Sequence, residues 1–472
     1  MVQEIALAKR ATLYCGSAEA EWSDFAVAVS LFETAETKGH LISKSIMNSP
    51  LFNHVADFLG EIKSLGATRL VDATSNLFRK SDTGQVLERL STLDALISNL
   101  SVFEASRAHD VIYAVLVLAK GTHMSAMVNG QRQTRNNYEA QTSVRSEPMS
   151  ATQQRLAKSV TRKLEKRVDE SRFTIDYDRP FFNVCKDFLT FTIHGSKSLD
   201  IICRPWVPVE GFTDGDPPPS WLLTMNKTAF GLRHDGSYSR KHADTLVGTP
   251  GVGKRNYSAS GSLEVTDKWR FGENNKARSM YAEGFVIDEV EDKKPSAMEG
   301  IIPHAWLDIG GWTERSALPP DAFWRTLIAD RGPNGLNPPA FYPLACKSAL
   351  NKSVEGSNIS TGTLVHNGKS DIVAEFLRRV HEVIWMKRLI NTKHELLGMG
   401  PDTTKRRDLI CILYGYNVPV ILRPQKDEKT GEAYFQFVGE CYVHGIMDGE
   451  AFESARSRSP EREIDKKVFE IR

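Results

Sequence analysis

The sequence predicts a mixed α/β and α+β protein, with a helical N-terminal part, an irregular mixed middle and a C-terminal antiparallel β module. Three observations predict this arrangement: helix-type apolar spacing in the first part, a polar stretch with few large apolar residues, and short β-branched runs near the end. A chain of 472 residues is long enough for about two to four domains. The boundaries that we expect are 1–35, 36–127, 128–168, 169–395 and 396–472.

Apolar spacing predicts helices in the first 127 residues. Ser23 can cap a helix whose apolar residues recur with a period of 3.6, namely Phe25, Ala28, Val29 and Phe32. A second helix is expected from Ser49-Pro50, because serine caps well and proline at the first helical position loses only an unpaired donor. The run 110–119 is apolar almost all round, so we expect it to be the buried centre of a helical bundle.

Polar composition from about Val128 to Arg167 predicts a linker. Such a segment cannot bury enough apolar surface to offset its ordering entropy, so we expect partial disorder, with a charged helix over 154–169. In the middle region, 187–193 and 198–203 have strand-like composition, and the second predicts a buried strand. Helices are predicted over 318–332, where Gly332 marks the end, and from Ser370 along the stripe Val373, Leu377, Val380 and Ile384.

Three short apolar runs predict the β module at the end of the chain: 409–413, 418–422 and 433–438. They are separated by Gly415-Tyr-Asn417 and by the turn-rich segment 426–431, which indicates an antiparallel sheet or a small barrel. Pro419 cannot donate to a ladder, so its strand is expected at an edge or at a bulge.

Composition and charge exclude several classes of protein. Lys+Arg number 60 and Asp+Glu 59, so the net charge is close to zero. We therefore expect no nucleic-acid partner, because nucleic-acid-binding proteins usually carry an excess of basic residues. We expect no membrane association and a cytoplasmic location, because the sequence has no signal peptide and no run of about 20 apolar residues. The six cysteines form no Cys-x-x-Cys pair and are expected as reduced thiols in cores.

Motifs of catalysis and ligand binding are incomplete. Gly248–Lys254 fits the first seven positions of a phosphate-binding loop, but Arg255 replaces the Ser/Thr that would hold magnesium, so we interpret it as a turn. The pairs His381-Glu382 and His394-Glu395 lack the second histidine of a zinc-protease motif. Cys441 and His444 supply half of a zinc ligand set. We therefore predict no catalytic residue, no cofactor and no metal.

Two groups of side chains invite a functional interpretation. The aromatic cluster Trp306, Trp312, Phe323 and Trp324 is expected to be core packing, and Arg325, Asp330 and Arg331 to be ion-paired surface residues. Among polar residues of the last block, our candidates for an interaction or functional loop are Glu440, His444 and Asp448, after the strand 433–438. The alternative is a hydrogen-bonded turn that only closes the sheet.

Several long stretches together resemble the fungal heterokaryon-incompatibility (HET) proteins. Residues 2–9 with 22–26 resemble the last block of the HET domain. Five further stretches resemble the region that follows that domain, namely 71–79, 103–114, 177–182, 198–206 and 323–331. The most specific are Arg407-Asp-Leu-Ile-Cys-Ile-Leu413 and Val438-Gly-Glu-Cys-Tyr-Val-His-Gly-Ile-Met-Asp-Gly-Glu450. The sequence departs from the family in two respects. The given sequence does not contain the front blocks of the HET domain, so the resemblance implies that 1–35 is a remnant of the last block, and Ala108-His109-Asp110 stands where the family has Pro-Arg-Asp.

The resemblance implies a role in self/non-self recognition (allorecognition) and programmed cell death after cell fusion, through protein–protein contacts. It implies other incompatibility proteins or an allelic partner as binding partners, with the oligomeric state undefined. Two alternatives stay open. One is an NAD- or nucleotide-hydrolysing effector, since the HET domain is likened to the TIR fold, and the other is a truncated inactive paralogue. The front blocks would supply such an active site, so the resemblance transfers no catalytic residue to this chain.

Overall fold

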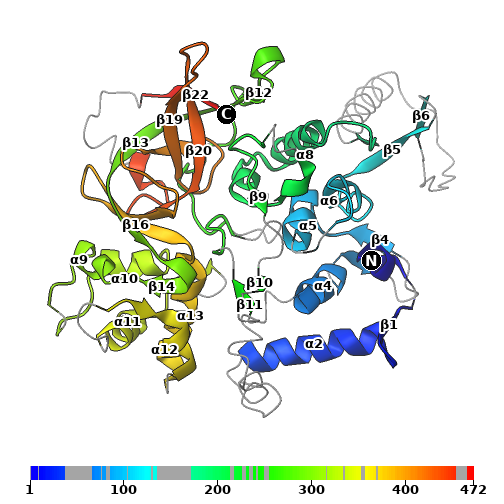
Figure 1. Cartoon of the computed structure of the whole chain (residues 1–472). Helices are drawn as coiled ribbons and strands as arrows, with labels where there is room; N and C mark the ends of the chain where they lie inside the picture. Colours follow the sequence, from blue (N-terminus) through cyan, green and yellow to red (C-terminus); the bar gives the residue numbers. More distant parts are fainter. Residues whose placement is uncertain are drawn as a thin grey trace, which may run out of the picture.

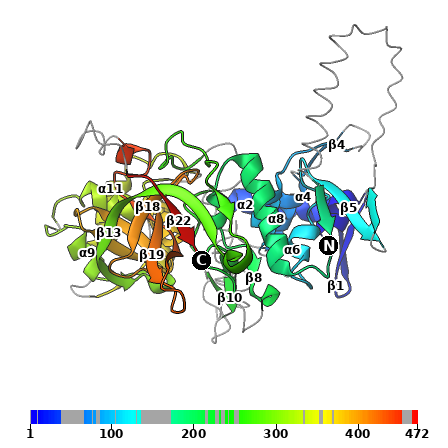
Figure 2. The same cartoon turned by 90° about the horizontal axis from the view of Figure 1, so that it is seen from above.

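A computed structural model defines the fold. It describes residues 2–8, 10–37, 66–75, 77–80, 86–101, 103, 105–128, 131–134, 172–212, 217–225, 230–232, 238–240, 243–248, 255–314, 316–332, 335–351, 357–367, 370–452 and 465–472. The chain forms two lobes that lie side by side, a helical lobe and a barrel lobe (Figures 1 and 2). The fold class predicted from the sequence is confirmed: helices dominate the first part and a β-barrel is built mainly from the last.

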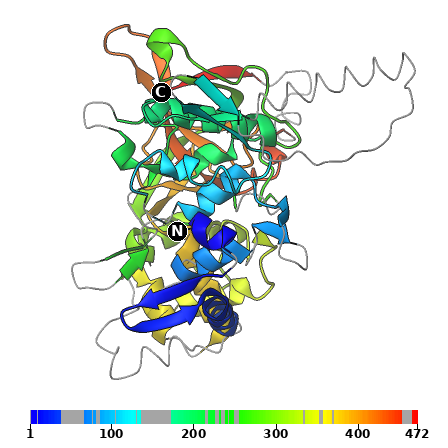
Figure 3. The same cartoon turned by 90° about the vertical axis from the view of Figure 1, so that its right-hand side faces the viewer.

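The helical lobe contains most of the described residues before 225. Its helices are α1 (Val2–Leu7), α2 (Trp22–Thr37), α4 (Gly66–Ser75), α5 (Leu93–Leu100), α6 (Asp110–Tyr113) and α8 (Phe181–Ser196). Its strands are β1 (Thr12–Cys15), β2 (Ala18–Glu21), β3 (Phe78–Lys80), β4 (Val86–Arg89), β5 (His123–Val128), β6 (Gln131–Thr134) and β7 (Arg172–Ile175). Helix α2 lies at the end of the molecule opposite the C-terminus (Figures 1 and 3).

Predictions for the first part of the chain are confirmed only in part. Helix α2 forms where expected, but Phe25, Val29 and Phe32 are half-buried and Ala28 is exposed, so its face is not a fully covered core. The run 110–119 supplies core side chains as predicted, although only its first four residues are α-helical. The expected helix from Ser49, residues 135–168 of the linker and the charged helix expected over 154–169 lie outside the described residues, whereas 131–134 pairs with β5 as a strand.

The two strand predictions in the middle region are wrong. Residues 187–193 belong to α8, whose buried positions recur at helical spacing along Phe181, Val184, Cys185, Phe188, Leu189, Thr192 and Ile193. Lys197 then adopts a left-handed conformation with φ 55°, and the next segment forms a 3-10 helix, η2 (Asp200–Cys203). A short, fully buried apolar run cannot be assigned to strand or helix by its periodicity alone, and here the helical form allows the Asp200 carboxylate to bind the barrel.

The barrel lobe is organised around a closed barrel of five strands. They are β13 (Met280–Ser296), β18 (Leu409–Leu413), β19 (Val420–Lys426), β20 (Ala433–Glu440) and β22 (Lys467–Ile471). Strand β13 pairs with both β18 and β22, and β20 pairs with β22, which closes the ring. The three predicted runs are confirmed as β18, β19 and β20. The barrel is mixed, because β20 and β22 are parallel, and it takes β13 from the middle region.

Strand β13 extends from the barrel into a second ladder. Beyond residue 290 it pairs with β16 (Lys387–Thr392), which continues through β17 (Leu397–Pro401) to β21 (Tyr442–Val443). Register shifts interrupt β13 within its pairings with β18 and with β16, and a further shift lies in β19 between Ile421 and Leu422. Bulges of this kind bend a strand and increase its twist, which allows one long strand to serve both ladders.

Helices pack below the barrel (Figure 1). They are α9 (Ala305–Ile309), α10 (Asp321–Leu327), α11 (Tyr342–Leu350), α12 (Thr361–Asn367) and α13 (Asp371–Ile384). Helix α13 is confirmed with its apolar stripe inward, whereas α10 ends five residues before the predicted Gly332 because Ala329 and Asp330 both have φ of 49°. The aromatic cluster around Trp306 is buried, as predicted for core packing.

One apolar core is continuous between the two lobes. A single cluster of buried side chains extends from α1 to β22 and includes Phe188 and Trp206 of the helical lobe with Leu413 and Phe437 of the barrel lobe. A second cluster covers the other face of β18 through Ile410 and Ile412. None of the helices in the described part of the chain has the length and apolar composition that a membrane crossing requires.

Short elements connect the lobes and decorate the barrel. The strands are β8 (Val207–Pro208), β9 (Thr224–Met225), β10 (Phe230–Leu232), β11 (Tyr238–Arg240), β12 (Arg270–Phe271), β14 (Ile301–Ile302) and β15 (Ile359–Ser360). The 3-10 turns are η3 (Val209–Gly211), η4 (Asn274–Lys276) and η5 (Met298–Gly300). Of the six cysteines, all free, five are buried as expected and Cys15 is exposed, contrary to the prediction.

Candidate functional site

A buried polar clamp lies where residues 243–248, which we call the strap, pass between the two lobes. The Glu440 carboxylate, at the last position of β20, accepts hydrogen bonds from the strap amides of Leu246 (2.7 Å) and Val247 (3.4 Å). From the helical lobe, the Arg204 guanidinium donates to the Gly248 carbonyl (2.6 Å). The strap is thus held by a carboxylate from the barrel and a guanidinium from the helical lobe, and charge-assisted hydrogen bonds of this kind are stronger than neutral ones.

The third charged residue of the clamp is Lys387, at the start of β16. Its Nζ lies 3.7 Å from a Glu440 oxygen, which makes an ion pair but is too long for a hydrogen bond. Among the described residues, this ammonium has no hydrogen-bond partner, although the side chain is only 9% exposed. A buried ammonium with one distant counter-ion depends strongly on that counter-ion, because removing it leaves an uncompensated charge in a medium of low dielectric.

Burial changes the proton affinities of this pair in opposite directions. Burial raises the pKa of Glu440 above its usual value, while Lys387 and the two strap amides partly oppose the shift. Burial also lowers the pKa of Lys387, and Glu440 partly opposes that shift. Each group is the main opposing influence on the pKa shift of the other, which couples the end of β20 to the start of β16.

A second buried contact joins the lobes at Asp200. Its carboxylate accepts hydrogen bonds from the Asn417 backbone amide (2.9 Å) and from the Asn417 side-chain amide. Burial raises the pKa of Asp200, opposed mainly by the Asn417 amide. Asp200 lies in η2 and Asn417 in the turn between β18 and β19, so the contact fixes that barrel turn against the helical lobe.

Asp448 and His444 lie in the segment after β21. Asp448 accepts hydrogen bonds from the Ser258 amide (3.1 Å) and from Arg331 (2.9 Å), whose guanidinium also lies 4.3 Å from the centre of the Tyr257 ring. The His444 Nδ1 atom is 3.2 Å from the Tyr442 hydroxyl. The sequence predicted that Glu440 lies on a loop, but it is the last residue of strand β20. Glu440 and Asp448 instead anchor different parts of the chain between 243 and 261.

The proton affinity of His444 provides a prediction about pH. Burial lowers the pKa of His444 below its usual value near 6.5, and Asp330 partly opposes this. Because the folded-state pKa is depressed, the contribution of His444 to stability is present above pH 6.5 and is lost as the pH falls through the folded-state pKa. We expect the melting temperature to fall between pH 7.5 and 5, and His444→Gln to reduce that fall. Equal pH profiles for the two proteins would contradict the assignment.

The described residues of the incomplete motifs form contacts within the fold. Only Gly248 of the phosphate-loop match is described, and its carbonyl accepts from Arg204. His381 pairs with the Thr361 hydroxyl (2.6 Å), and the His394 Nδ1 atom lies 3.0 Å from a carboxylate oxygen of buried Asp288. Cys441 is fully buried, which raises the pKa of its thiol. Within the described residues, no group of three or more His, Cys, Asp or Glu side chains could hold a metal ion.

The arginine cluster at the end of α10 and just after it is ion-paired, as expected. Arg325 pairs with Asp330, and Arg331 pairs with Asp448. The Arg331 side chain is only 12% exposed, however, so it is a buried anchor more than a surface group.

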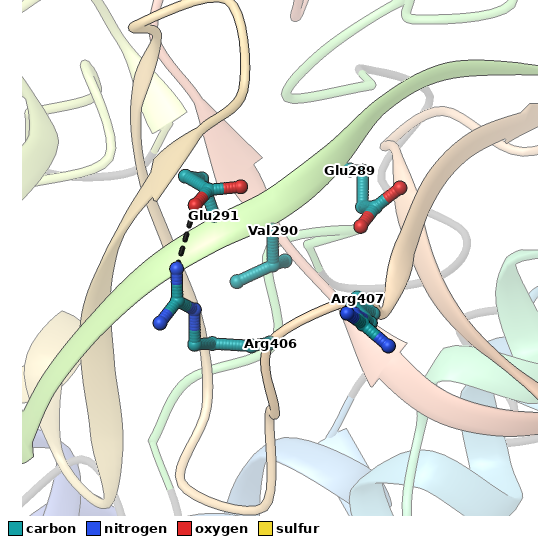
Figure 4. Close-up of a pocket in the computed structure, with 5 residues that line it drawn as sticks. All are labelled: Glu289, Val290, Glu291, Arg406 and Arg407. Atoms are coloured by element: carbon teal, nitrogen blue, oxygen red, sulfur yellow. Dashed lines mark hydrogen bonds and ion pairs between the residues drawn. The ribbon is translucent and has the colours of Figure 1, made fainter.

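A separate polar pocket lies on the outside of the barrel, between the bend of β13 and the loop before β18. Its volume is about 460 Å3, and it is lined by Glu289, Val290, Glu291, Arg406 and Arg407. Figure 4 shows Glu291 and Arg406, which form an ion pair of 2.6 Å, on one side of Val290, and Glu289 and Arg407 on the other. The pocket therefore contains one ion pair, Glu291 with Arg406, and two more side chains of opposite charge, Glu289 and Arg407.

Arg204 and Lys387 were not recognised as candidates from the sequence. Arg204 is a single charged residue inside an otherwise apolar run, Ile-Ile-Cys-Arg204-Pro-Trp, whereas Lys387 is one of two adjacent charged residues in Ile-Trp-Met-Lys387-Arg-Leu-Ile. A lone charge in such a run is a signal for a buried, paired group, since charged side chains are almost never fully buried without a partner. The partner itself comes from a distant part of the chain and cannot be read from the spacing.

Comparison with known proteins places the C-terminal part of the chain in a class. Residues 365–459 match the family model of the Het-6 beta-barrel domain, and they include α13, β16, β17 and the barrel strands β18 to β20. Among curated proteins, the chain is similar to heterokaryon incompatibility protein 6, OR allele, of Neurospora crassa, with 35% identity over 69 residues. That stretch is 15% of this chain and spans 10% of the length of the Neurospora protein. No solved structure matches the chain.

The matched region contains part of the clamp. Lys387 and Glu440 lie within residues 365–459, as do Arg406 and Arg407 of the pocket, whereas Arg204, the strap and Glu289 lie outside. The resemblance noted in the sequence is confirmed in its coarser form: residues 365–459 match the Het-6 beta-barrel domain, and a stretch of 69 residues is similar to a heterokaryon incompatibility protein.

Proposed function

We propose that this protein acts in heterokaryon incompatibility, in self/non-self recognition and programmed cell death after cell fusion, through contacts with other proteins. The observation that carries the proposal is the match of residues 365–459 to the Het-6 beta-barrel domain. The partner that we propose is another incompatibility protein or an allelic product.

The geometry of the barrel lobe supports a role in contacts. The matched barrel is closed, and its end is fixed by buried charges from three separate elements, so that its outer loops are held on a rigid support. A rigid support lowers the entropic cost of binding, because the contact surface is already ordered before the partner arrives.

The proposal is tested by expressing the full chain from an inducible promoter in a fungal host. The strain is fused with itself and with strains of different incompatibility type, and hyphal compartments that admit a vital dye are counted. We expect dye-positive compartments to rise several-fold in at least one unlike pairing and to stay at background in self-fusions. Equal counts in all pairings, with the protein present at normal level, would remove the support for the proposal.

Alanine variants of the predicted loop residues refine this test. His444→Ala and Asp448→Ala are each measured twice, by melting temperature in vitro and by dye uptake after fusion. Loss of dye uptake with an unchanged melting temperature indicates that the residue contacts the partner. Loss of stability alone indicates a turn that closes the sheet, as in the alternative stated for these residues.

A further inference from the structure

The pocket on the outside of the barrel carries two opposite charges without a partner. Among the described residues, neither the Glu289 carboxylate nor the Arg407 guanidinium forms an ion pair or a side-chain hydrogen bond, although both line the same pocket. Their neighbours differ, because Glu291 and Arg406 satisfy one another at 2.6 Å. The pocket thus presents an acceptor and a fork of donors on the same side of Val290 (Figure 4).

The backbone that carries Arg407 is strained and firmly held. Arg407 has φ of 69°, a left-handed conformation that costs a non-glycine residue on the order of 1–3 kcal/mol. Its amide donates to the Val290 carbonyl (2.9 Å), and the Val290 amide donates to the Asp408 carbonyl (2.9 Å). Strain persists only where the surrounding structure maintains it, and such positions concentrate at ligand sites.

The loop behind Arg407 is fixed by a buried carboxylate. Asp408, 1% exposed, accepts hydrogen bonds from the Lys405 amide (2.7 Å) and two from Arg423 (2.8 and 2.9 Å). These contacts hold the loop without using the Arg407 guanidinium. The backbone position of Arg407 is therefore set before any ligand binds.

The opposite wall is equally ordered. The Glu289 amide donates to the Asp288 carboxylate (2.8 Å), and the Glu289 carbonyl accepts from the Lys393 amide (2.9 Å). Asp288 is itself buried and paired with His394. Hydrogen bonds therefore fix the backbone on both sides of the pocket, and the Glu289 and Arg407 side chains form no ion pair with one another.

We propose that this pocket binds a small zwitterion of the α-amino-acid type, with its carboxylate on Arg407 and its ammonium on Glu289. A planar guanidinium offers two parallel donors to a carboxylate, and a carboxylate is the natural acceptor for an ammonium. A volume of about 460 Å3 is within the range of small-ligand pockets. A singly charged molecule would satisfy one wall and leave the other charge unpaired, so the pocket favours ligands that carry both charges.

Three probes of similar size separate this proposal from a simple ion site: L-alanine, propionate and ethylammonium. Binding to the purified full chain is measured by saturation-transfer NMR, which detects weak ligands. We expect L-alanine to bind, and propionate and ethylammonium each to bind about tenfold more weakly, a difference of about 1.4 kcal/mol. Raising the salt concentration should weaken binding, because these charges are at least partly exposed and are screened.

Matched variants decide which residues hold the ligand. Arg407→Gln and Glu289→Gln should each weaken L-alanine binding about tenfold. Lys405→Gln removes the same charge two positions away, on a side chain that does not line the pocket, and should change the affinity less than about twofold. Melting temperatures should stay unchanged for the two Arg407 and Glu289 variants, since neither side chain has a partner to lose. No L-alanine signal, equal binding of propionate, or an unaffected Arg407→Gln variant would each overturn the proposal.

Discussion

Replacing Glu440 by alanine should lower the free energy of unfolding by about 3–5 kcal/mol, because breaking a buried ion pair leaves the other charge uncompensated. In this protein the loss has two parts: Lys387 loses its counter-ion, and the strap amides of Leu246 and Val247 lose their acceptor. The measurement is urea unfolding of the full chain, followed by circular dichroism. A change below about 0.5 kcal/mol, the usual range for surface substitutions, would show that the clamp contributes little.

Two further variants separate the parts of this effect. Lys387→Met leaves Glu440 with its two strap amides, so we expect a smaller loss than for Glu440→Ala. The double variant Lys387→Met, Glu440→Leu removes both charges, and it should be less destabilised than Glu440→Ala, since replacing a buried pair by apolar residues is often close to neutral. If the double variant loses the sum of the two single losses, the ion pair is not the source of the effect.

The local sequence pattern predicted those elements whose apolar residues recur at a regular spacing or whose ends are marked by turn residues. The stripe from Val373 to Ile384 and the three runs after residue 408 became α13, β18, β19 and β20, because each element has one buried face or is bounded by turns. The partners of these strands were not predictable. Strand β13 is rich in charged residues, and its pairing with β18 depends on contacts more than 100 residues apart in the chain.

Short apolar runs were the source of the errors in the middle region. Residues 198–203 have the composition of a buried strand, yet the segment is a 3-10 helix whose first residue, Asp200, bonds the barrel turn at Asn417. Tertiary contact decided the conformation there, and no local signal reports it. The same holds for the clamp, where Arg204, Lys387 and Glu440 come from three elements that meet only after folding.

Asp200→Ala is expected to have the second large effect, because it removes the buried carboxylate that binds the barrel turn at Asn417 and leaves, among the described residues, only the bonds from Leu199 and Ser198 to the Gly415 carbonyl. The Asn417 backbone amide and side-chain amide would both lose their acceptor in a buried site. An orphaned buried donor costs about 1–3 kcal/mol, so we expect a loss on the order of 2–5 kcal/mol for the two together. Urea unfolding gives the total, and hydrogen exchange of the Asn417 amide reports the turn itself.

The asparagine variant shows whether hydrogen bonding or charge dominates at this position. Asp200→Asn keeps an oxygen for the Asn417 backbone amide, but its own NH2 group faces the NH2 group of Asn417 unless that amide rotates. Burial raises the pKa of Asp200, so a neutral side chain also avoids the cost of a buried charge. We therefore expect Asp200→Asn to retain more stability than Asp200→Ala. A double-mutant cycle with Asn417→Ala should give a coupling of at least about 1 kcal/mol, and additive losses would mean that this contact does not join the lobes.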